Sequence, residues 1–401
     1  IVFSIGLVLA AFGVGNMFQA WSVGDSFEHY FAIPSWMTGV ALATLTGVVI
    51  VGGVKRIGKI AELIVPFMCG LYVLAGSYVI LSHAELLPSI FGQIIHSAFN
   101  PHEAMGAFVG GSFATAFMWG MKRALFSSES GMGSAPIAHS AVKTKEPVTE
   151  GIVAGLEPFI DTLVVCTITA LVVLTTGVWN RAEIAQYSQA PSFVAVANQA
   201  NTWQLESKTL PTHNQAEPWQ VGDKVFVVVD TGKVVDGSKQ YQRVYGVFEQ
   251  DNTFHWGAIE STQQPTLRDT KLYANITGAA LTAVAFDSVI PGFGKWVVTL
   301  AVLLFAFSTM VSWSYYGEQG VRYLVGDKGV IPYRLVYCVL VVVACMGFIT
   351  TGEQLDSIGS FGVGLMLIIN LPMVVLFAPQ ITRAYRDYVR RLDAGEIKRI
   401  R

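Results

Sequence analysis

The chain of 401 residues is 52% apolar and only 13% charged, with a formal net charge of −2. A soluble globular protein carries about 25% charged residues, and a larger core does not remove its need for polar surface. Together with a mean hydropathy of +0.50, this composition excludes an ordinary soluble domain and predicts contact with lipid. Because no basic domain stands out, no nucleic-acid partner is expected.

Eight apolar segments are candidates for membrane-spanning helices, since a span needs about 20 apolar residues to cross about 30 Å of hydrocarbon. They are residues 1–21, 36–54, 62–82, 104–121, 150–177, 295–316, 333–350 and 357–379. The shorter apolar stretch 275–290 is interpreted as a re-entrant or interfacial piece. Since the chain begins at Ile1 inside an apolar run, we expect further sequence before it.

The lysines and arginines of the connections alternate from one side of the membrane to the other. They occur near residues 55–59, in 122–145, in 322–334 and in the tail 381–401. The connections without any are 22–35, 83–103 and 351–356. Short loops rich in Lys and Arg face the cytoplasm. The pattern therefore predicts a multi-pass inner-membrane protein with a cytoplasmic C-terminus.

The composition becomes polar over residues 178–274, which the charge pattern puts on the outer side. Residues 225–234 predict a strand, a turn at Asp-Thr-Gly and a second strand, and 241–249 with 253–259 predict a hairpin around Asp-Asn. This predicts a small β-rich insertion, either a cap on the membrane part or a ligand-sensing or partner-binding module. The expected regions are helices over 1–177, the insertion 178–274, helices over 275–380 and the basic tail 381–401.

Several functional classes lack their signatures. No phosphate-binding G-x-x-x-x-G-K-[ST] loop is present, so ATP is not expected to drive the protein. Neither His/Cys metal spacing nor a Ser/His/Asp arrangement can be argued, so we expect no cofactor and no enzyme. A pore would need a continuous ring of polar residues, which is not found, and a sensor would need more than the short tail 381–401 as a signalling domain.

Adjacent glycines, Gly110 and Gly111, interrupt the span 104–121. Each weakens a helix by about 1 kcal/mol, and non-helical backbone at membrane depth survives where it lines a cavity. Discontinuous helices hold substrates and ions in secondary transporters; close helix packing through small residues is the alternative. Gly13 and Gly15 of the first span are attributed to such packing.

Polar side chains lie within two later spans. Asp161, followed by Thr162, is an intramembrane carboxylate and hence a functional candidate, unless it bonds the backbone. Ser308 and Thr309 offer hydroxyl oxygens suited to a hard cation, although such hydroxyls also bond back to their own helix. Trp313 follows Thr309 by one turn on the same face. It predicts either a wall for a small side chain or ordinary packing.

A longer pattern connects these residues. The segment 120–136, GMKRALFSSESGMGSAP, resembles the signature G-x-x-R-G-x-F-S-N-E-A-G-x-G-S-A-P of the alanine or glycine:cation symporter family. Residues 159–170 and 305–318 look like two of its helices, and 13–19, GVGNMFQ, is similar to its motif G-x-G-N-M-x-Q. The departures are Ser128 for Asn, Ser130 for Ala, Ala124 for Gly and Trp21 where Asn is common.

The resemblance implies an all-α polytopic protein with the five-plus-five inverted-repeat (leucine-transporter-like) fold, here lacking about three helices before Ile1. It implies import of alanine, glycine or similar amino acids by alternating access, with Na⁺ as coupling ion. The residues it implies are Gln19, Gly110, Gly111, Thr309 and Trp313 for substrate, and Ser308 and Thr309 for Na⁺. Asp161 and Thr162 are candidates for coupling or gating. A membrane sensor and a transport-inactive fragment are the alternatives.

Overall fold

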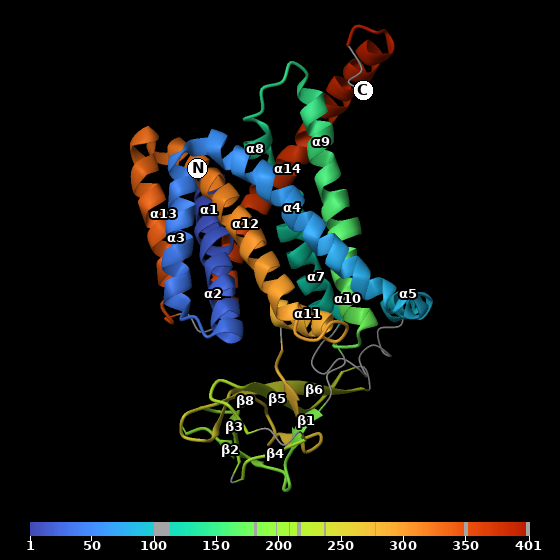
Figure 1. Cartoon of the computed structure of the whole chain (residues 1–401), viewed down its shortest axis with the longest axis vertical. Helices are drawn as coiled ribbons and strands as arrows, with labels where there is room; N and C mark the ends of the chain where they lie inside the picture. The colour runs from blue at the N-terminus through green and yellow to red at the C-terminus, as the bar shows by residue number, and fades with distance from the viewer. Residues whose placement is uncertain are drawn as a thin grey trace. The chain divides into compact units, whose positions relative to one another are not determined.

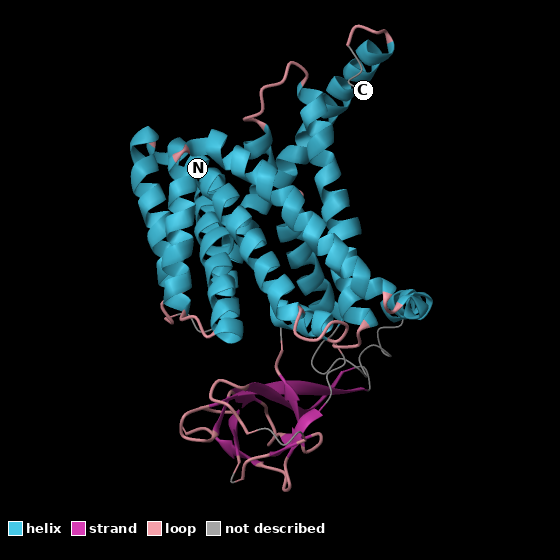
Figure 2. Ribbon diagram, viewed as in Figure 1, coloured by secondary structure: helices cyan, strands magenta, loops and turns pink. Residues whose placement is uncertain are grey.

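The computed structural model describes residues 1–99, 113–179, 183–197, 199–207, 209–214, 218–235, 238–276, 278–348 and 352–397. The chain forms two compact units. The first comprises Ile1–Ile80, Met121–Leu171 and Ile290–Arg401, and the second comprises Leu81–Gly120 and Val172–Val289. Helices make up the first unit, and the strands all belong to the second (Figures 1 and 2).

The helices are labelled as in Figure 1. They are α1 (Val2–Phe12), η1 (Gly13–Met17), α2 (Phe18–Phe31), α3 (Ser35–Val51), α4 (Gly53–Leu81), η2 (Ala84–Leu86), α5 (Leu87–Phe99), α7 (Phe113–Ser128), α8 (Ala135–His139), α9 (Pro147–Phe159), η3 (Ile160–Cys166), α10 (Thr167–Thr175), α11 (Gly278–Asp287), α12 (Gly294–Val325), η4 (Asp327–Gly329), α13 (Val330–Ala344) and α14 (Gly352–Asp393).

Five helices among the described residues are long and apolar enough to cross a membrane. They are Val2–Phe31, Gly53–Leu81, Pro147–Thr175, Gly294–Val325 and Leu355–Asp393. Five of the eight predicted spans fall on them. The second falls on the shorter apolar helix α3 and the seventh on the 15-residue α13. Of the fourth, residues 104–112 lie outside the described residues and 113–121 fall on α7. The stretch 275–290 contains the short apolar helix α11.

Large apolar side chains cover the outer faces of α4 and α14. Leu63 and Leu74 of α4 are 77% and 74% exposed, and Val375 of α14 is 72% exposed. A soluble monomer rarely exposes wide apolar patches, whereas lipid tails are a favourable neighbour for such side chains. The exposure of these faces therefore fits helices that are surrounded by a bilayer.

Glycines bring α1 and α14 into backbone contact. A methyl group added at Gly362 would lie 2.6 Å from the backbone nitrogen of Ala10, and one at Gly13 would lie 2.8 Å from Gly359 Cα. Small residues allow such an approach between membrane helices. The attribution of Gly13 to helix packing is thus confirmed. In the same unit α1 also packs on α12, and α3 on α13 (Figure 1).

Over the described part of the chain, the strands form two antiparallel sheets. They are β1 (Glu183–Gln186), β2 (Ser192–Ala195), β3 (Thr202–Glu206), β4 (Thr212–His213), β5 (Lys224–Val235), β6 (Ser238–Phe248), β7 (Phe254–Trp256), β8 (Ala258–Glu260), β9 (Thr266–Leu267) and β10 (Lys271–Ala274). The larger sheet runs β4-β1-β10-β5-β6-β7, with β9 on β5, and the smaller runs β2-β3-β8. Their buried apolar side chains share one core, so the predicted β-rich insertion is present.

One predicted turn of this insertion is confirmed and the other is wrong. Strands β6 and β7 pair as a hairpin whose turn holds Asn252 at φ 59°. The Asp-Thr-Gly segment instead lies inside β5, where the backbone N–H of Gly232 donates to Asp230 Oδ1 at 2.8 Å. Pairing with β6 resumes at Val234, so the segment is an irregularity within one strand. Because β6 pairs with β5 on both sides of Asp-Thr-Gly, the strand continues through a sequence that by itself is typical of a turn.

Candidate functional site

Residues 13–17 of the motif form a π-helical turn, η1, between α1 and α2, and Gln19 lies in the first turn of α2. Such wide turns are frequent at functional sites. Gln19 Nε2 donates to the carbonyl of Val14 at 3.0 Å, so its amide satisfies backbone in the turn. Asn16 is fully buried and donates through Nδ2 to the Tyr337 carbonyl at 2.8 Å. Its Oδ1 has no hydrogen-bond partner among the described residues, which leaves a buried acceptor beside the turn.

Tyr337 of α13 ties this turn to α12. Its hydroxyl donates to the Met310 carbonyl at 2.8 Å and lies 3.3 Å from the Gly15 carbonyl. The hydroxyl is completely buried with the rest of the side chain. We call these two contacts of the Tyr337 hydroxyl the clamp. Because Met310 directly follows Thr309, the clamp fixes the backbone beside Thr309 against η1.

Trp313 forms a buried wall over the turn. Its side chain is 2% exposed, and a methyl group at Gly15 would lie 2.6 Å from it. Phe126 stacks on the indole at 6.1 Å between ring centroids, and Tyr316 meets it edge-on at 5.5 Å. Helix α12 contacts both η1 and α2. The structure therefore brings together the segments that carry Gln19, Thr309 and Trp313.

Ser308 is directed elsewhere. Its hydroxyl donates to the carbonyl of Phe305 at 2.9 Å and lies 3.8 Å from Met68 Sδ on α4. A hard cation prefers oxygen ligands, and a thioether is a soft ligand. Thr309, one residue further along α12, is half-buried. The thioether contact makes Ser308 the poorer candidate of the two for a cation.

Asp161 and Thr162 lie in a second π-helical stretch, η3. Asp161 Oδ2 accepts a hydrogen bond from Ser127 Oγ at 2.5 Å, so the carboxylate is tied to the end of α7. Thr162 is exposed, and its carbonyl accepts from Thr167 Oγ1 at 3.2 Å. Gly110 and Gly111 lie outside the described residues.

A charged cluster joins α7 to α14 and was missed from the sequence. Lys122 forms an ion pair with Asp356, and Arg123 NH1 lies 3.5 Å from Asp356 Oδ1. Asp356 is only 5% exposed. Helix α7 continues through both cations to Ser128, so they lie in a helix and not in a loop. The buried Asp356 carboxylate is the counter-charge of both cations. Because Lys122 and Asp356 are 234 residues apart, this pairing cannot be recognised from the sequence.

The signature segment forms a buried turn between α7 and α8. Glu129, Gly131 and Gly133 have φ of 50°, 79° and 85°, all in the left-handed region. Ser134 Oγ donates to Glu129 Oε2 at 2.6 Å. Burial raises the pKa of Glu129 to about 7 despite this bond. The segment was predicted as a motif, but the raised pKa of its glutamate was not predicted.

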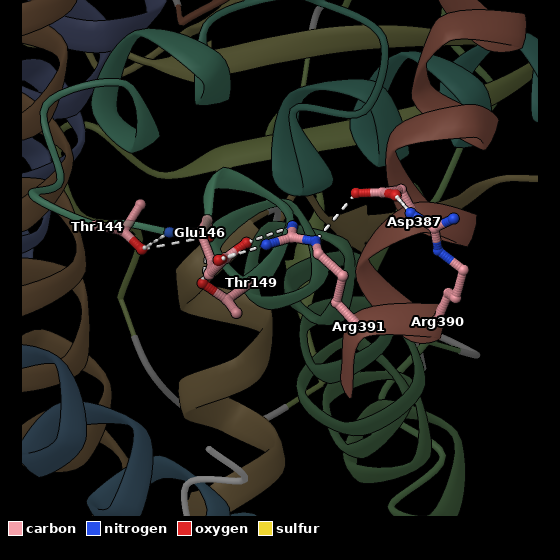
Figure 3. Close-up of polar contacts among 6 residues, drawn as sticks. All are labelled: Thr144, Glu146, Thr149, Asp387, Arg390 and Arg391. Atoms are coloured by element: carbon pink, nitrogen blue, oxygen red, sulfur yellow. Dashed lines mark hydrogen bonds and ion pairs between the residues drawn. The ribbon is translucent and has the colours of Figure 1, made fainter. Parts of the chain in front are cut away.

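An ion pair also ties the start of α9 to the end of α14 (Figure 3). Arg391 NH1 and NH2 lie 2.9 and 2.8 Å from the two carboxylate oxygens of Glu146. Asp387 Oδ2 accepts from Arg391 Nε at 3.0 Å. The bond from Arg391 holds the pKa of Glu146 below its ordinary value. Thr149 Oγ1 donates to the Glu146 carbonyl at 2.6 Å and completes the connection.

The comparison with known proteins agrees with the motifs. The profile of the sodium:alanine symporter family matches residues 1–206 and 264–401. The chain belongs to the sodium:alanine symporter family. It is therefore a multi-pass membrane protein from a family of transporters, and the resemblance drawn from the motifs is confirmed. Residues 207–263, which include most of the larger sheet, lie outside the match.

Three relatives illustrate the range of the family. The sodium/alanine symporter AgcS of Methanococcus maripaludis is 32% identical over 98% of this chain and 66% of its own length. The sodium/proton-dependent alanine carrier protein of Bacillus sp. (strain PS3) is 28% identical over 94% of this chain and 67% of its own length. GlnT of Bacillus subtilis, named a probable sodium/glutamine symporter, is 25% identical over 97% of this chain. The chain spans 66%, 67% and 61% of these three proteins.

Proposed function

We propose that the protein containing this chain imports small neutral amino acids, alanine or glycine, together with Na⁺. The observation that carries the proposal is the clamped contact between η1 and α12, in a member of the sodium:alanine symporter family. Three of the proposed substrate residues, Gln19, Thr309 and Trp313, belong to the segments that meet there. The names of two relatives, both alanine carriers, favour a small substrate.

The pocket we propose has Trp313 as its wall and Gln19 at its floor. Gln19 uses one amide N–H on Val14, and an amide has a second N–H and an oxygen for a zwitterion. Gly110 and Gly111, which lie outside the described residues, stay candidates for substrate binding on the strength of the family resemblance. A buried indole beside a hydroxyl favours a methyl or hydrogen side chain over a long one.

The cation in this scheme is held by oxygen atoms, among them Thr309 Oγ1, with Ser308 as the weaker candidate. Asp161 and Thr162 would couple or gate the movement through the bond from Ser127. A Na⁺ that enters with one charge contributes about 2.3 kcal/mol per 100 mV, which can drive uphill uptake. The protein would work by alternating access, with the five-plus-five inverted-repeat fold, in the cytoplasmic membrane with its C-terminus inside.

The test is uptake of labelled alanine into proteoliposomes that contain the full-length protein, with and without an inward Na⁺ gradient. Thr309→Ala is expected to raise the Na⁺ concentration for half-maximal uptake by about tenfold, as loss of one polar contact worth about 1.4 kcal/mol. Ser308→Ala is the matched control and should change it much less. Unchanged Na⁺ dependence in Thr309→Ala would contradict the site.

The wild-type protein tests the function itself in the same assay. Uptake that ignores the Na⁺ gradient would indicate a pore. Absence of uptake, together with ligand binding by the outer insertion, would indicate a sensor. Competition by glycine and glutamine then gives the substrate range, and strong competition by glutamine would contradict a pocket closed by Trp313.

A further inference from the structure

Arg123 of α7, the arginine of the signature segment 120–136, contacts two other helices. Its NH1 lies 3.5 Å from Asp356 Oδ1 on α14, and its guanidinium carbon lies over the Phe18 ring of α2, 5.8 Å from the ring centre. Lys122 forms an ion pair with the second oxygen of the same carboxylate. Because Asp356 is only 5% exposed, its carboxylate has a fixed position and holds the guanidinium over the ring.

Phe18 is the residue that closes the π-helical turn η1. Its backbone N–H donates to the carbonyl of Gly13, five residues earlier in the chain, and a bond of this spacing defines such a turn. Gln19 follows directly, and its side-chain amide donates to the carbonyl of Val14 in the same turn. The position of the Phe18 side chain therefore constrains the backbone that places Gln19.

Helix α7 also contacts the Trp313 wall of the candidate site. Phe126 follows Arg123 by three residues, so the two side chains are neighbours on one face of α7. Phe126 stacks on Trp313 at 6.1 Å between ring centroids, and α14 packs on both η1 and α2. One face of α7, which Asp356 ties to α14, thus contacts both Phe18 and Trp313.

We propose that Arg123 is a positioning residue whose guanidinium, held by Asp356, fixes Phe18 and thereby places Gln19 for the amino-acid substrate. The inference rests on the proposed function. A planar guanidinium pairs with a carboxylate through its edge and stacks on an aromatic ring through its face, whereas the ammonium group of a lysine is a compact point charge. Stacking of this kind is stronger where water is excluded. Lysine therefore keeps the charge beside Asp356 but loses the hold on Phe18.

The first experiment measures KM and maximal rate for Na⁺-driven alanine uptake by the full-length protein in proteoliposomes. Arg123→Lys should raise the KM for alanine about fivefold, the range of one cation–π contact, with little change in maximal rate. Arg123→Gln should raise the KM at least as much. A KM of Arg123→Lys equal to that of the wild type, or a change in maximal rate at unchanged KM, would overturn the proposal.

A double-mutant cycle tests the contact with Phe18 directly. Phe18→Leu keeps an apolar side chain but removes the ring, so adding it to Arg123→Lys should raise the KM little further, because both changes remove the same stack. Lys122→Arg is the matched control, since it also exchanges the cation beside Asp356 while keeping the charge, and its effect should add to that of Phe18→Leu. Additive effects of Arg123→Lys and Phe18→Leu, or equal coupling of Phe18 to Lys122, would contradict the inference.

A second readout does not depend on transport. Amide hydrogen exchange reports local opening, and residues 13–19 should exchange about fivefold faster in Arg123→Lys than in the wild type, while residues 224–235 of β5 should exchange equally. Equal exchange at 13–19 would overturn the inference. If Arg123→Lys does not fold, Phe18→Leu serves in its place and should give the same increase. If the wild type shows no Na⁺-driven uptake, the proposed function fails, whereas the exchange rates still decide whether Arg123 holds the turn.

Discussion

At Gly15 the lack of a side chain is what allows Trp313 to lie directly on the π-helical turn. A methyl group there would meet the Trp313 side chain at 2.6 Å, closer than van der Waals contact. We expect Gly15→Ala to destabilise the protein by about 1–3 kcal/mol, the usual cost of overpacking. It should also weaken alanine binding, because the wall must move. Thermal unfolding in detergent measures the loss of stability, and isothermal titration calorimetry measures the affinity for alanine.

Gly70→Ala is the control for that substitution. Gly70 also lies inside a long apolar helix, α4, but a methyl group there would meet nothing within 4 Å. Because Ala favours helix over Gly by about 1 kcal/mol, this variant should be neutral or slightly more stable. Equal behaviour of the two variants would mean that the Gly15–Trp313 contact contributes nothing specific.

At the scale of elements, the charged cluster between α7 and α14 makes the clearest prediction. Asp356 is almost fully buried and faces both Lys122 and Arg123. Asp356→Asn should cost about 1–3 kcal/mol, because a buried carboxylate loses its bonds to two cations that are themselves partly exposed. Loss of thermal stability in detergent or of expression in membranes measures it.

Asp327→Asn is the matched control for Asp356→Asn. Asp327 is 87% exposed and lies 3.6 Å from Arg322 Nε. Exposed pairs contribute about 0–1 kcal/mol, so this change should be nearly silent. A similar loss of thermal stability in both variants would show that the charged cluster between α7 and α14 does not specifically stabilise the protein.

The two π-helical stretches show how elements depend on context. The segments around Gln19 and Asp161 both have ordinary apolar helical patterns, and each carries a wider turn in the structure. In the first, Gln19 bonds the Val14 carbonyl and Tyr337 lies near the Gly15 carbonyl. A wide turn survives when its backbone groups find such partners. The partners come partly from another helix, so periodicity alone does not reveal it.

At the scale of the whole molecule, the Glu146–Arg391 pair links two segments that are distant in sequence (Figure 3). Arg391→Gln should speed amide hydrogen exchange in residues 144–150, because the start of α9 loses its connection to α14. Exchange reports such local opening directly. Arg390→Gln is the control, since Arg390 contacts Asp387 but not Glu146. Equal exchange in both variants would contradict the link.

The same pair has a defined pH dependence. The bond from Arg391 lowers the pKa of Glu146 in the folded protein. Its contribution is therefore fully present above the ordinary glutamate pKa and is lost as pH falls through the lowered value. The protection of residues 144–150 should be constant near neutral pH and should decrease only in acid.

The membrane class, most of the apolar spans, the β-rich insertion and the family could be predicted from the amino-acid sequence, because hydropathy and short motifs are local properties of the chain. The contact of Lys122 with Asp356, 234 residues away, and that of Asn16 with Tyr337, 321 residues away, follow from the packing of the helices. The packing also places the Ser308 hydroxyl near Met68 Sδ. Such contacts depend on how helices pack, and packing is a property of the whole set of side chains at once. The contacts of the candidate site therefore cannot be derived from the sequence alone and follow from the packing of the helices.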